Sequence, residues 1–520
     1  MARHRIAAAA AAARPLVLLL LVLLLLASAA ATRLAIIGDF GDDSSGELDV
    51  SNMVKAWEAT SPLKAIATVG DNNYPSGLAT TIQANIGKYY GAYIKDDPAV
   101  NKFWPCPGNH DWGNQCHDGT RLQPYLNYFK ALKNKRYYDA KIGADLHLFM
   151  LDSDCNEPDG RTASSAQAAW LQGALAASAA AFKLVLLHHA PFSSSSRHGS
   201  NKATQWPYEE WGADAVFAGH DHTYERHSNP RNLAGKAGFP YFVNGLGGKD
   251  IYGFKKALPS TQFRYNAMHG AQLLVTRSRA AAGGGTEFEL DLTFYSSDGT
   301  VQDCYRITKA PGGTSYTTGS PACPAAGLQQ FSVLTSAAVP VAPAAPTPAK
   351  VWRYLGTGKK ALSLGGSNPW TSLGFGDSAW TSGPSPLGYG PGLVWGTQLP
   401  ANAPSSGTGY YHFRTTVCLP ASLITQLGSA VTLKLASDKR AKVWVNRQLV
   451  ASEPSKAGHP ASHWNLQTAL KPGALVAGPN VIAVQVANTA GASSTGFDLD
   501  LTYFSTQPFT NASTVGAWHD

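Results

Sequence analysis

The stretch Ala65-Ile66-Ala67-Thr68-Val69-Gly70-Asp71-Asn72-Asn73-Tyr74 runs from an apolar segment directly into a polar loop. An apolar run followed by Gly-Asp-Asn is typical of a buried strand that opens into a turn. The Asp71 carboxylate has two oxygens and can bridge two cations, and Tyr74 can turn its phenolate toward one of them. The stretch by itself fits an ordinary turn as well as a metal site, so the rest of the chain must decide between them.

Four other short polar stretches follow apolar runs in the same way. They are Gly38-Asp39-Phe40-Gly41, Gly108-Asn109-His110-Asp111, His188-His189-Ala190-Pro191 and Gly219-His220-Asp221-His222. One such stretch fits a helix cap or a solvated histidine. Five in order are hard to explain as independent turns, because ligands in α/β proteins gather at the ends of strands.

The mixture of ligand types indicates which metals would bind. Carboxylate, amide and phenolate oxygens combined with imidazoles suit a dinuclear iron, zinc or manganese site better than calcium or an all-thiolate centre. Two neighbouring cations bind a phosphate, polarise its phosphorus and generate a hydroxide nucleophile. Hydrolysis of phosphate esters therefore follows from the ligand chemistry.

The five stretches, in this order, make residues 34–303 similar to the calcineurin-like metallophosphoesterases. The resemblance is closest to the purple acid phosphatases of the small, tartrate-resistant type. Related phosphodiesterases and protein phosphatases carry a histidine two residues after the first aspartate, where this chain has Gly41. Tyr74 supplies a phenolate instead, and that exchange marks the purple enzymes, whose tyrosinate binds Fe(III). The resemblance implies an α/β sandwich of two mixed sheets flanked by helices.

The resemblance also implies a ligand set, carried over position by position. The ferric ion would be held by Asp39, Asp71, Tyr74 and His222, and a second divalent ion (Fe, Zn or Mn) by Asp71, Asn109, His189 and His220. In the family the ligand histidine is followed by proline two residues later and by a His-Gly pair nine residues later. Pro191 and His198-Gly199 stand at these distances from His189, so His189 is preferred to His188.

Two further histidines are expected to act on the substrate. By the same match, His198 would orient the substrate or protonate the leaving alkoxide. Arg197 replaces the acidic neighbour that is usual in the family, which would alter leaving-group protonation or the pH optimum. His110 follows a predicted ligand and would hydrogen-bond the phosphate or bridging solvent, or serve a structural role. The expected mechanism is in-line attack by a metal-activated hydroxide, without a covalent phosphoenzyme.

Strand-like and helix-like segments alternate through the first part of the chain. Strands are expected at residues 34–37, 65–69, 146–151, 183–187, 215–218 and 241–243, with a helix at 166–181. This alternation predicts an α/β layered domain. Residues 272–276 and 286–295 are expected to be antiparallel strands that close the second sheet. The run Asn244-Gly245-Leu246-Gly247-Gly248 lacks the dinucleotide-binding register and is expected to allow close backbone packing beside the site.

A second domain is expected after a linker rich in proline and alanine at residues 309–350. Strand-like runs at 410–418, 430–436, 441–445, 481–486 and 497–503 predict an all-β sandwich. Aromatic motifs such as Val443-Trp444-Val445-Asn446 resemble the galactose-binding-like jelly roll that many secreted hydrolases carry. Trp370, Trp380 and Trp395 would stack on sugars if they are exposed, whereas in most sandwiches such residues fill the core.

The N-terminus predicts secretion. Three arginines precede an apolar run at residues 15–26 and a group of small residues, which indicates a signal peptide over residues 1–31. Cleavage is expected before Thr32 or after Ala29, with a secreted, wall-associated or vacuolar product and no membrane anchor. Removing the three arginines lowers the formal charge from +8 to +5, and without a Lys/Arg run nucleic acid is excluded as a partner.

The remaining expectations concern domain limits and modifications. The predicted metallophosphoesterase domain spans 32–308, the sandwich 351–505 and a tail 506–520. The six cysteines lack CxxC spacing, so disulfides are expected, with Cys304–Cys323 as the first candidate pair. Asn511-Ala512-Ser513 is an N-glycosylation sequon.

The leading interpretation is a secreted acid phosphatase that releases phosphate from monoesters. One alternative is a phosphodiesterase or nucleotide hydrolase at the same site. Another is a wall- or matrix-binding protein in which the sandwich binds carbohydrate or a wall polymer and is the main functional part.

Overall fold

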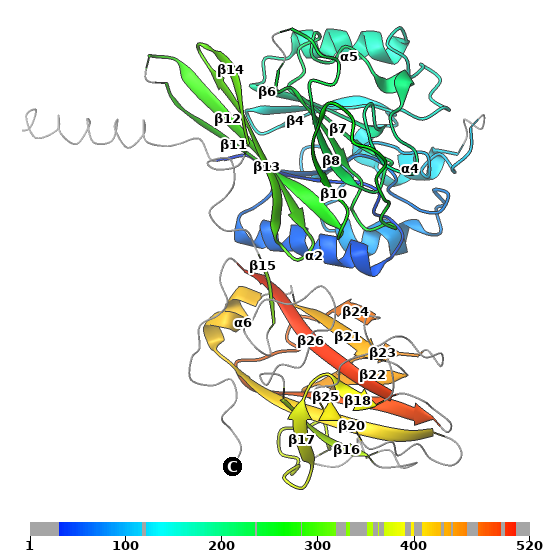
Figure 1. The fold of residues 1–520 in the computed structure, drawn as a ribbon, viewed down its shortest axis with the longest axis vertical. Helices are drawn as coiled ribbons and strands as arrows, with labels where there is room; N and C mark the ends of the chain where they lie inside the picture. The colour runs from blue at the N-terminus through cyan, green and yellow to red at the C-terminus, as the bar shows by residue number, and fades with distance from the viewer. Residues whose placement is uncertain are drawn as a thin grey trace, which may run out of the picture. The chain divides into compact units, whose positions relative to one another are not determined.

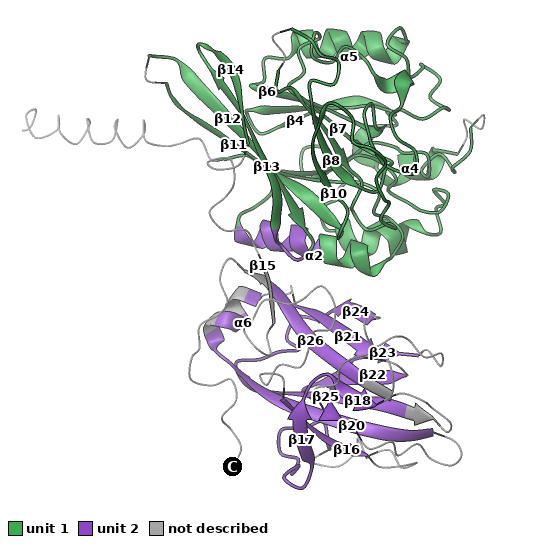
Figure 2. Ribbon diagram, viewed as in Figure 1, with its two compact units in different colours: residues 1–50, 61–297, 301–325 green, residues 51–60, 298–300, 326–520 purple. Residues whose placement is uncertain are grey.

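The computed structural model describes residues 31–116, 121–234, 237–281, 283–318, 329–332, 351–356, 362, 369–389, 397–399, 408–427, 431–437, 440–454, 466–489 and 495–505. The chain forms two compact units (Figure 2). One comprises residues 1–50, 61–297 and 301–325, and the other comprises residues 51–60, 298–300 and 326–520.

The first sheet of the first unit has seven strands in the order β14-β13-β12-β11-β1-β2-β3 (Figure 1). Its strands are β1 (Arg33–Ile37), β2 (Ala65–Thr68), β3 (Phe103–Pro105), β11 (Gly270–Ala280), β12 (Thr286–Ser296), β13 (Val301–Ala310) and β14 (Gly313–Thr318). β1, β2 and β3 are parallel neighbours, and β11 to β14 are antiparallel. The sheet is therefore mixed. The loops after β1, β2 and β3 all leave from the same end of the sheet, where these three strands have their carboxyl ends.

The second sheet of this unit also has seven strands, in the order β10-β8-β9-β7-β6-β5-β4. They are β4 (Tyr138–Ile142), β5 (Leu146–Met150), β6 (Phe182–His189), β7 (Ala215–Gly219), β8 (Tyr224–Ser228), β9 (Pro240–Asn244) and β10 (Thr261–Tyr265). β5, β6, β7 and β9 are parallel, and the other strands are antiparallel to their neighbours. The prediction of two mixed sheets is confirmed.

Helices connect the strands. They are α2 (Ser45–Thr60), α3 (Lys88–Tyr90), α4 (Gln123–Tyr128) and α5 (Ala166–Ala177), with short turns at Gln83–Gly87, Lys130–Leu132 and Lys202–Thr204. α5 begins where the Ser165 side chain accepts a hydrogen bond from the Ala168 amide, and it buries Leu171 and Leu175 one turn apart. It ends at Ala177, four residues before the predicted end at residue 181, because Ser178 has an extended backbone conformation.

Two expectations about the first unit need correction. The segments expected at 272–276 and 286–295 are strands, but they extend the first sheet rather than close the second. β2 occupies one edge of β1, and β11 takes the other, with Leu34 opposite Leu274. Regular structure also continues past residue 308, because β13 and β14 pair from Tyr305↔Thr318 to Ala310↔Gly313. Residues 309–318, predicted to be linker, therefore belong to this sheet.

The second unit contains two six-stranded sheets. One has the order β19-β18-β26-β21-β24, with β15 paired to β26, and the other has the order β17-β16-β20-β25-β22-β23. The strands are β15 (Gln329–Ser332), β16 (Val351–Gly356), β17 (Thr381–Pro384), β18 (Leu387–Tyr389), β19 (Thr397–Gln398), β20 (Thr408–Leu419), β21 (Thr432–Ser437), β22 (Ala441–Val445), β23 (Gln448–Glu453), β24 (Leu466–Ala469), β25 (Gly478–Thr489) and β26 (Thr495–Ser505), with one helix, α6 (Ala421–Leu427). All described pairings are antiparallel except β18 with β19. The predicted second β region is confirmed, and β15 lies inside the predicted linker.

Two of the three tryptophans expected to bind sugars are in the interior. Trp370 is 1% exposed and Trp380 is 9% exposed, and both pack with Trp444 in one apolar cluster. They therefore offer no open ring face for a sugar. Trp395 lies outside the described residues.

Several other expectations also fall outside the described residues. They concern the signal peptide up to residue 30, the linker at 319–328 and 333–350, Cys323, and the tail with Asn511. In the part of the chain that the structure describes, no helix is both long and apolar enough to cross a membrane.

Candidate metal centre

The predicted ligands lie at the carboxyl ends of strands from both sheets of the first unit. Asp39, Asp71 and Asn109 lie on the loops after β1, β2 and β3, which are parallel neighbours. His188 and His189 end β6, and His220 and His222 directly follow β7, the parallel neighbour of β6. The parallel arrangement brings these side chains to one place, as it does in α/β proteins in general.

Asp71 is the centre of the arrangement and is 1% exposed. Its Oδ2 accepts a hydrogen bond from Tyr74 Oη at 3.1 Å and lies 3.3 Å from His188 Nε2. Its Oδ1 accepts a hydrogen bond from the His110 amide at 2.9 Å. One carboxylate thus faces two groups of side chains, as the predicted bridging role requires.

The first group contains Asp39, Tyr74 and His222. His222 Nε2 lies 3.2 Å from Tyr74 Oη and 3.6 Å from Asp39 Oδ1. His222 Nδ1 lies 2.5 Å from the Asp250 carbonyl, which can only accept, so Nδ1 carries the hydrogen and the lone pair of Nε2 faces the group. Three of the predicted ferric ligands therefore meet beside Asp71.

The second group contains Asn109, His188 and His220. His188 Nε2 lies 2.9 Å from Asn109 Oδ1 and 3.2 Å from His220 Nδ1. Asn109 Nδ2 donates a hydrogen bond to Asn114 Oδ1 at 2.9 Å, which directs the amide oxygen toward His188. Potential ligand atoms of Asp71, His188 and His220 all lie within 4.8 Å of one another.

His188, rather than the predicted His189, therefore reaches the divalent-ion group. The two residues are adjacent at the end of β6, and their ring centroids lie 5.1 Å apart. His189 Nδ1 lies 2.9 Å from Ser153 Oγ, and this hydroxyl already accepts the amides of His188 and His189. The hydroxyl therefore donates its hydrogen to Nδ1, which leaves the hydrogen of the neutral His189 ring on Nε2. His189 is buried beside His220, with ring centroids 4.4 Å apart, but it is a hydrogen-bond donor there.

The two predicted substrate histidines lie at the edge of the centre. The His198 ring is 3.9 Å from the His220 ring and is exposed. His110 Nδ1 lies 2.5 Å from the Pro75 carbonyl and so donates to it, while Nε2 lies 3.8 Å from Asp71 Oδ2. Both rings are therefore placed where a ligand of the centre could reach them.

The protonation of the centre tests whether its donor set fits a metal ion. His188 Nδ1 donates to the Val69 carbonyl, so its Nε2 faces the oxygens of Asn109 and Asp71, which are acceptors. Burial disfavours the charged imidazole, but the Asp71 carboxylate overrides it and raises the pKa of His188 to about 10. Burial alone would raise the pKa of Asp71, yet the His188 charge holds it well below its usual range. A proton on His188 here does what a cation would do, so the donor set fits a metal ion.

Tyr74 gives a second test of fit. Burial and the neighbouring Asp71 charge both raise the pKa of Tyr74 well above its ordinary value. Without a cation the phenol therefore keeps its hydrogen and donates it to Asp71. A phenolate ligand at this position requires a strongly charged metal ion beside it.

The backbone around the ligands is tightly constrained. Asp39, Asp71 and His220 all have positive φ angles, of 56°, 51° and 69°, which are uncommon for residues with a side chain. Gly41 explains why the chain has no histidine at that position. A Cβ atom there would lie 1.7 Å from the Asn72 carbonyl oxygen, so only glycine fits.

The glycine-rich run after β9 packs against the centre as predicted. A Cβ atom at Gly245 would lie 2.2 Å from the Asp221 carbonyl oxygen and 3.0 Å from Asp39 Oδ2. A Cβ atom at Gly247 would lie 2.3 Å from the Gly38 carbonyl oxygen. This run allows the loops that carry Asp39 and His222 to approach each other.

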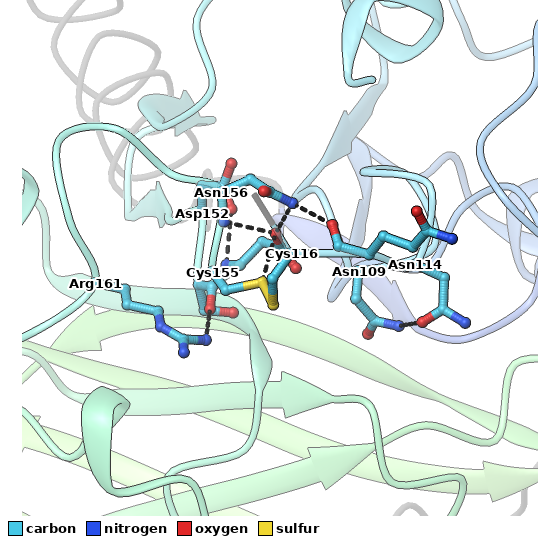
Figure 3. Close-up of a disulfide and its surroundings, with 10 residues drawn as sticks. Asn109, Asn114, Cys116, Asp152, Cys155, Asn156 and Arg161 are labelled. Atoms are coloured by element: carbon cyan, nitrogen blue, oxygen red, sulfur yellow. Dashed lines mark hydrogen bonds between the residues drawn. A yellow bond between two sulfur atoms is a disulfide. The ribbon is translucent and has the colours of Figure 1, made fainter. Parts of the chain in front are cut away.

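A disulfide joins two loops of the centre (Figure 3). Cys116, on the loop after Asn109, is bonded to Cys155, which follows Ser153. Asn156 Nδ2 also donates to the Gln115 carbonyl at 2.7 Å. The bridge therefore restrains the loop that carries Asn109 relative to the serine that orients His189. Cys106 and Cys418 are free thiols.

The model of the calcineurin-like phosphoesterase family matches residues 31–224 of this chain. This region is a calcineurin-like metallophosphoesterase domain. The matched residues contain all five motif stretches, from Asp39 to His222. A metallophosphoesterase domain is a metal-dependent hydrolase of phosphoesters, which agrees with the cluster of Asp71, His188 and His220.

Solved structures give more distant similarities. GAP50 of Plasmodium is 16% identical, with a TM-score of 0.38, and the alignment covers 51% of this chain and 85% of that one. The purple acid phosphatase PPD1 from yellow lupin is 16% identical, with a TM-score of 0.41, and the alignment covers 53% of each chain. A β-glucuronidase of Bifidobacterium dentium is 16% identical, with a TM-score of 0.20, over 32% of this chain and 21% of that one. No curated protein is similar enough to count as a match.

Sequence reasoning missed several residues that shape the centre. Ser153, Asn114 and Asp250 orient His189, Asn109 and His222 through single hydrogen bonds, and the Tyr252 ring stacks on His222 at 4.0 Å. None belongs to a motif stretch, so no sequence signal marks them. His188 does stand in a motif stretch, but the family spacing selects its neighbour His189 instead.

Proposed function

We propose that this protein is a secreted acid phosphatase that hydrolyses phosphate monoesters at a dinuclear centre containing Fe(III) and a divalent metal. The observation that supports it most is the pair of side-chain groups on either side of Asp71. Tyr74 and His222 lie on one side, and Asn109 and His188 lie on the other. A single carboxylate between two such groups is what a bridging ligand needs.

The proposed ligand sets follow from this geometry. The ferric ion is assigned to Asp39, Asp71, Tyr74 and His222, and the divalent ion (Fe, Zn or Mn) to Asp71, Asn109, His188 and His220. His188 replaces His189 in the set expected from sequence spacing, because its Nε2 is the imidazole atom beside Asn109 and Asp71. His189 instead donates from Nε2 at the edge of the divalent-ion group.

When bound, the two cations would polarise the phosphate and activate the attacking water. The chain itself supplies orientation and proton transfer. The Pro75 carbonyl accepts a hydrogen bond from His110 Nδ1, so only the imidazolium form of His110 also carries a hydrogen on Nε2 that it can donate to a phosphate oxygen beside Asp71. His198, exposed beside His220, is placed to donate a proton to the leaving oxygen. Burial lowers the pKa of His198, although the Asp221 charge opposes this, so proton donation is favoured in acid.

The disulfide between Cys116 and Cys155 supports secretion, because such bridges form and persist in oxidising compartments. The bridge lies beside the centre, so forming it also restrains the loop that carries Asn109. Carbohydrate binding by the second unit stays a proposal that does not rest on stacking by Trp370 or Trp380, because both are buried.

The deciding experiment measures colour and activity together. Purified protein should contain iron and show a visible charge-transfer band from a phenolate bound to Fe(III). Tyr74→Phe should abolish the band, because it removes the only tyrosine hydroxyl in contact with Asp71 among the described residues. Tyr252→Phe is the matched control, since its ring stacks on His222 without belonging to the ligand set, and its band should remain.

Two results would contradict parts of the proposal. A colourless, iron-free and fully active protein would remove the ferric assignment but leave phosphoester hydrolysis intact. A purple protein that hydrolyses phosphodiesters but no phosphate monoester would overturn the phosphatase assignment.

A further inference from the structure

Arg197 stands at the rim of the metal centre and has no assigned role. We infer that Arg197 makes this enzyme favour substrates that carry a second anionic group next to the scissile phosphate, as phosphoanhydrides do. The inference rests on the proposed function, because the metal ions must hold the first phosphate.

Arg197 is connected to both sides of the centre. It directly precedes His198, whose ring lies 3.9 Å from the His220 ring on the divalent-ion side. Its guanidinium carbon lies 5.7 Å from the centroid of the Tyr252 ring. That ring is stacked at 4.0 Å on His222 on the ferric side. The Arg197 guanidinium therefore lies one ring away from a proposed ferric ligand, and its backbone adjoins a residue that packs on a proposed divalent-ion ligand.

The charge of Arg197 is available to a ligand. Its side chain is exposed, and no carboxylate in the described part of the chain forms an ion pair with it. Lys249 is the contrasting case, with Nζ 5.4 Å from the Tyr74 ring, because Asp42 pairs with it at 3.0 Å. Arg197 thus adds an uncompensated positive charge at the open edge of the site.

The backbone of Arg197 is held firmly. Asp221 accepts the amides of His198 at 3.1 Å and Gly199 at 2.9 Å. On the other side, the buried Glu225 accepts hydrogen bonds from the Ser193 hydroxyl and from the amide and hydroxyl of Ser194. The loop carrying Arg197 is therefore fixed to the segment that carries His220 and His222.

This placement suits a second phosphate. A guanidinium forms paired hydrogen bonds with phosphate oxygens and cannot lose its charge at physiological pH. A substrate with a neutral leaving group offers Arg197 nothing to bind. The arginine should therefore discriminate between classes of leaving group without being needed for the chemistry at phosphorus.

The test compares inorganic pyrophosphate with phenyl phosphate in the full-length, metal-loaded protein. Arg197→Gln should lower the ratio of kcat/KM for pyrophosphate to that for phenyl phosphate by about tenfold, the loss expected for one charge-assisted contact at an exposed edge. Arg197→Glu should lower it further, and Arg197→Lys should restore part of it. Arg279→Gln is the matched control, because Arg279 is an exposed arginine paired with Glu287 and should leave the ratio unchanged.

A binding measurement makes the test independent of turnover. Methylenediphosphonate should bind more tightly than methylphosphonate to the wild type, and Arg197→Gln should remove most of that difference in calorimetric affinity. A ratio within twofold of wild type in both Arg197→Gln and Arg197→Glu would overturn the inference. An equal loss for both substrates would also overturn it, since Arg197 would then act through His198. A wild-type protein that hydrolyses neither substrate would instead contradict the proposed function.

Discussion

His188 and His189 are adjacent, and the structure gives them opposite hydrogen-bonding roles. His188 Nε2 faces the oxygens of Asp71 and Asn109, whereas His189 accepts a hydrogen from Ser153 at Nδ1 and keeps one on Nε2. Only the first arrangement can bind a cation through the imidazole. The two histidines therefore provide a clean test of the ligand assignment.

His188→Ala should lose about one metal ion per chain and reduce kcat by at least roughly 100-fold, because removal of even an indirect partner of a metal ligand costs about 10–100-fold. His189→Ala should keep both ions and lose less activity. The measurement is elemental analysis of the purified variants beside phosphatase kinetics. His147→Ala is the control, since this buried histidine of β5 bonds Asp139 of β4 and Ser178 at the end of α5. Loss of metal from His189→Ala alone would restore the assignment made from spacing.

Glu225 gives a prediction about pH. Burial would raise its pKa, but the interactions with His227, Ser194 and Ser193 outweigh burial and lower the pKa below its ordinary value. A carboxyl with a lowered pKa stabilises the fold above its unfolded-state pKa, and this stability is lost as the pH falls through the folded-state value. Glu225→Gln should therefore destabilise the protein near neutral pH by about 1–3 kcal/mol and by less in acid. Urea unfolding at a series of pH values measures the difference, and equal losses at every pH would contradict it.

At the scale of elements, the close packing of the loops that follow the strands sets the geometry of the centre. Gly108, on the loop after β3, lies against the Asp71 loop, where a Cβ atom would come within 2.3 Å of Asp71 Oδ1 and 2.4 Å of its amide nitrogen. Gly108→Ala should therefore displace Asp71, destabilise the fold by about 1–3 kcal/mol and impair binding of both ions.

The matched control is Gly173→Ala in α5, where an added Cβ atom meets nothing within 4 Å. That change should stabilise the helix by about 0.5–1 kcal/mol. Thermal unfolding and metal content of the two variants give the comparison. A fully loaded Gly108→Ala protein would show that the loops can separate without harm to the centre.

The strands that carry the ligands could be predicted because each is a buried apolar run that ends in a distinct polar motif. β1, β2, β6 and β7 all follow this pattern. The choice between His188 and His189 could not be predicted, because it depends on which face each side chain takes. The pairing of β6 with β7 shifts register between Leu186 and His189, so the alternation of the strand does not carry through to its end.

Other elements gave weaker signals for physical reasons. β8 (Tyr224–Ser228) is almost fully buried yet contains Glu225, Arg226 and His227, so it lacks an apolar pattern. Partners distant in sequence stabilise these polar side chains. Arg226, for example, forms an ion pair with Asp303 at 2.8 Å. Sequence periodicity reports burial through apolar residues and therefore misses buried polar strands.

At the scale of the whole molecule, the end of the first unit is testable by truncation. β14 pairs with β13 over six residue pairs, so a chain that ends at residue 308 loses this pairing and leaves β13 as an incomplete edge strand. A chain that ends at residue 325 keeps it. The shorter chain should unfold at a lower temperature and aggregate more readily. Equal melting temperatures by circular dichroism would show that the sheet needs nothing after residue 308.

The pairing of β1 with β11 has a consequence for biosynthesis. Leu34 pairs with Leu274, so the strand before Asp39 has one open edge until about 240 further residues have been made. At roughly 5–20 residues per second, a ribosome needs about 12–48 seconds to make them. During this time the newly made N-terminal half cannot close its first sheet, and it exposes an edge that other chains could join. The half-made sheet is therefore the stage of synthesis at which this chain is most exposed to pairing with other nascent chains.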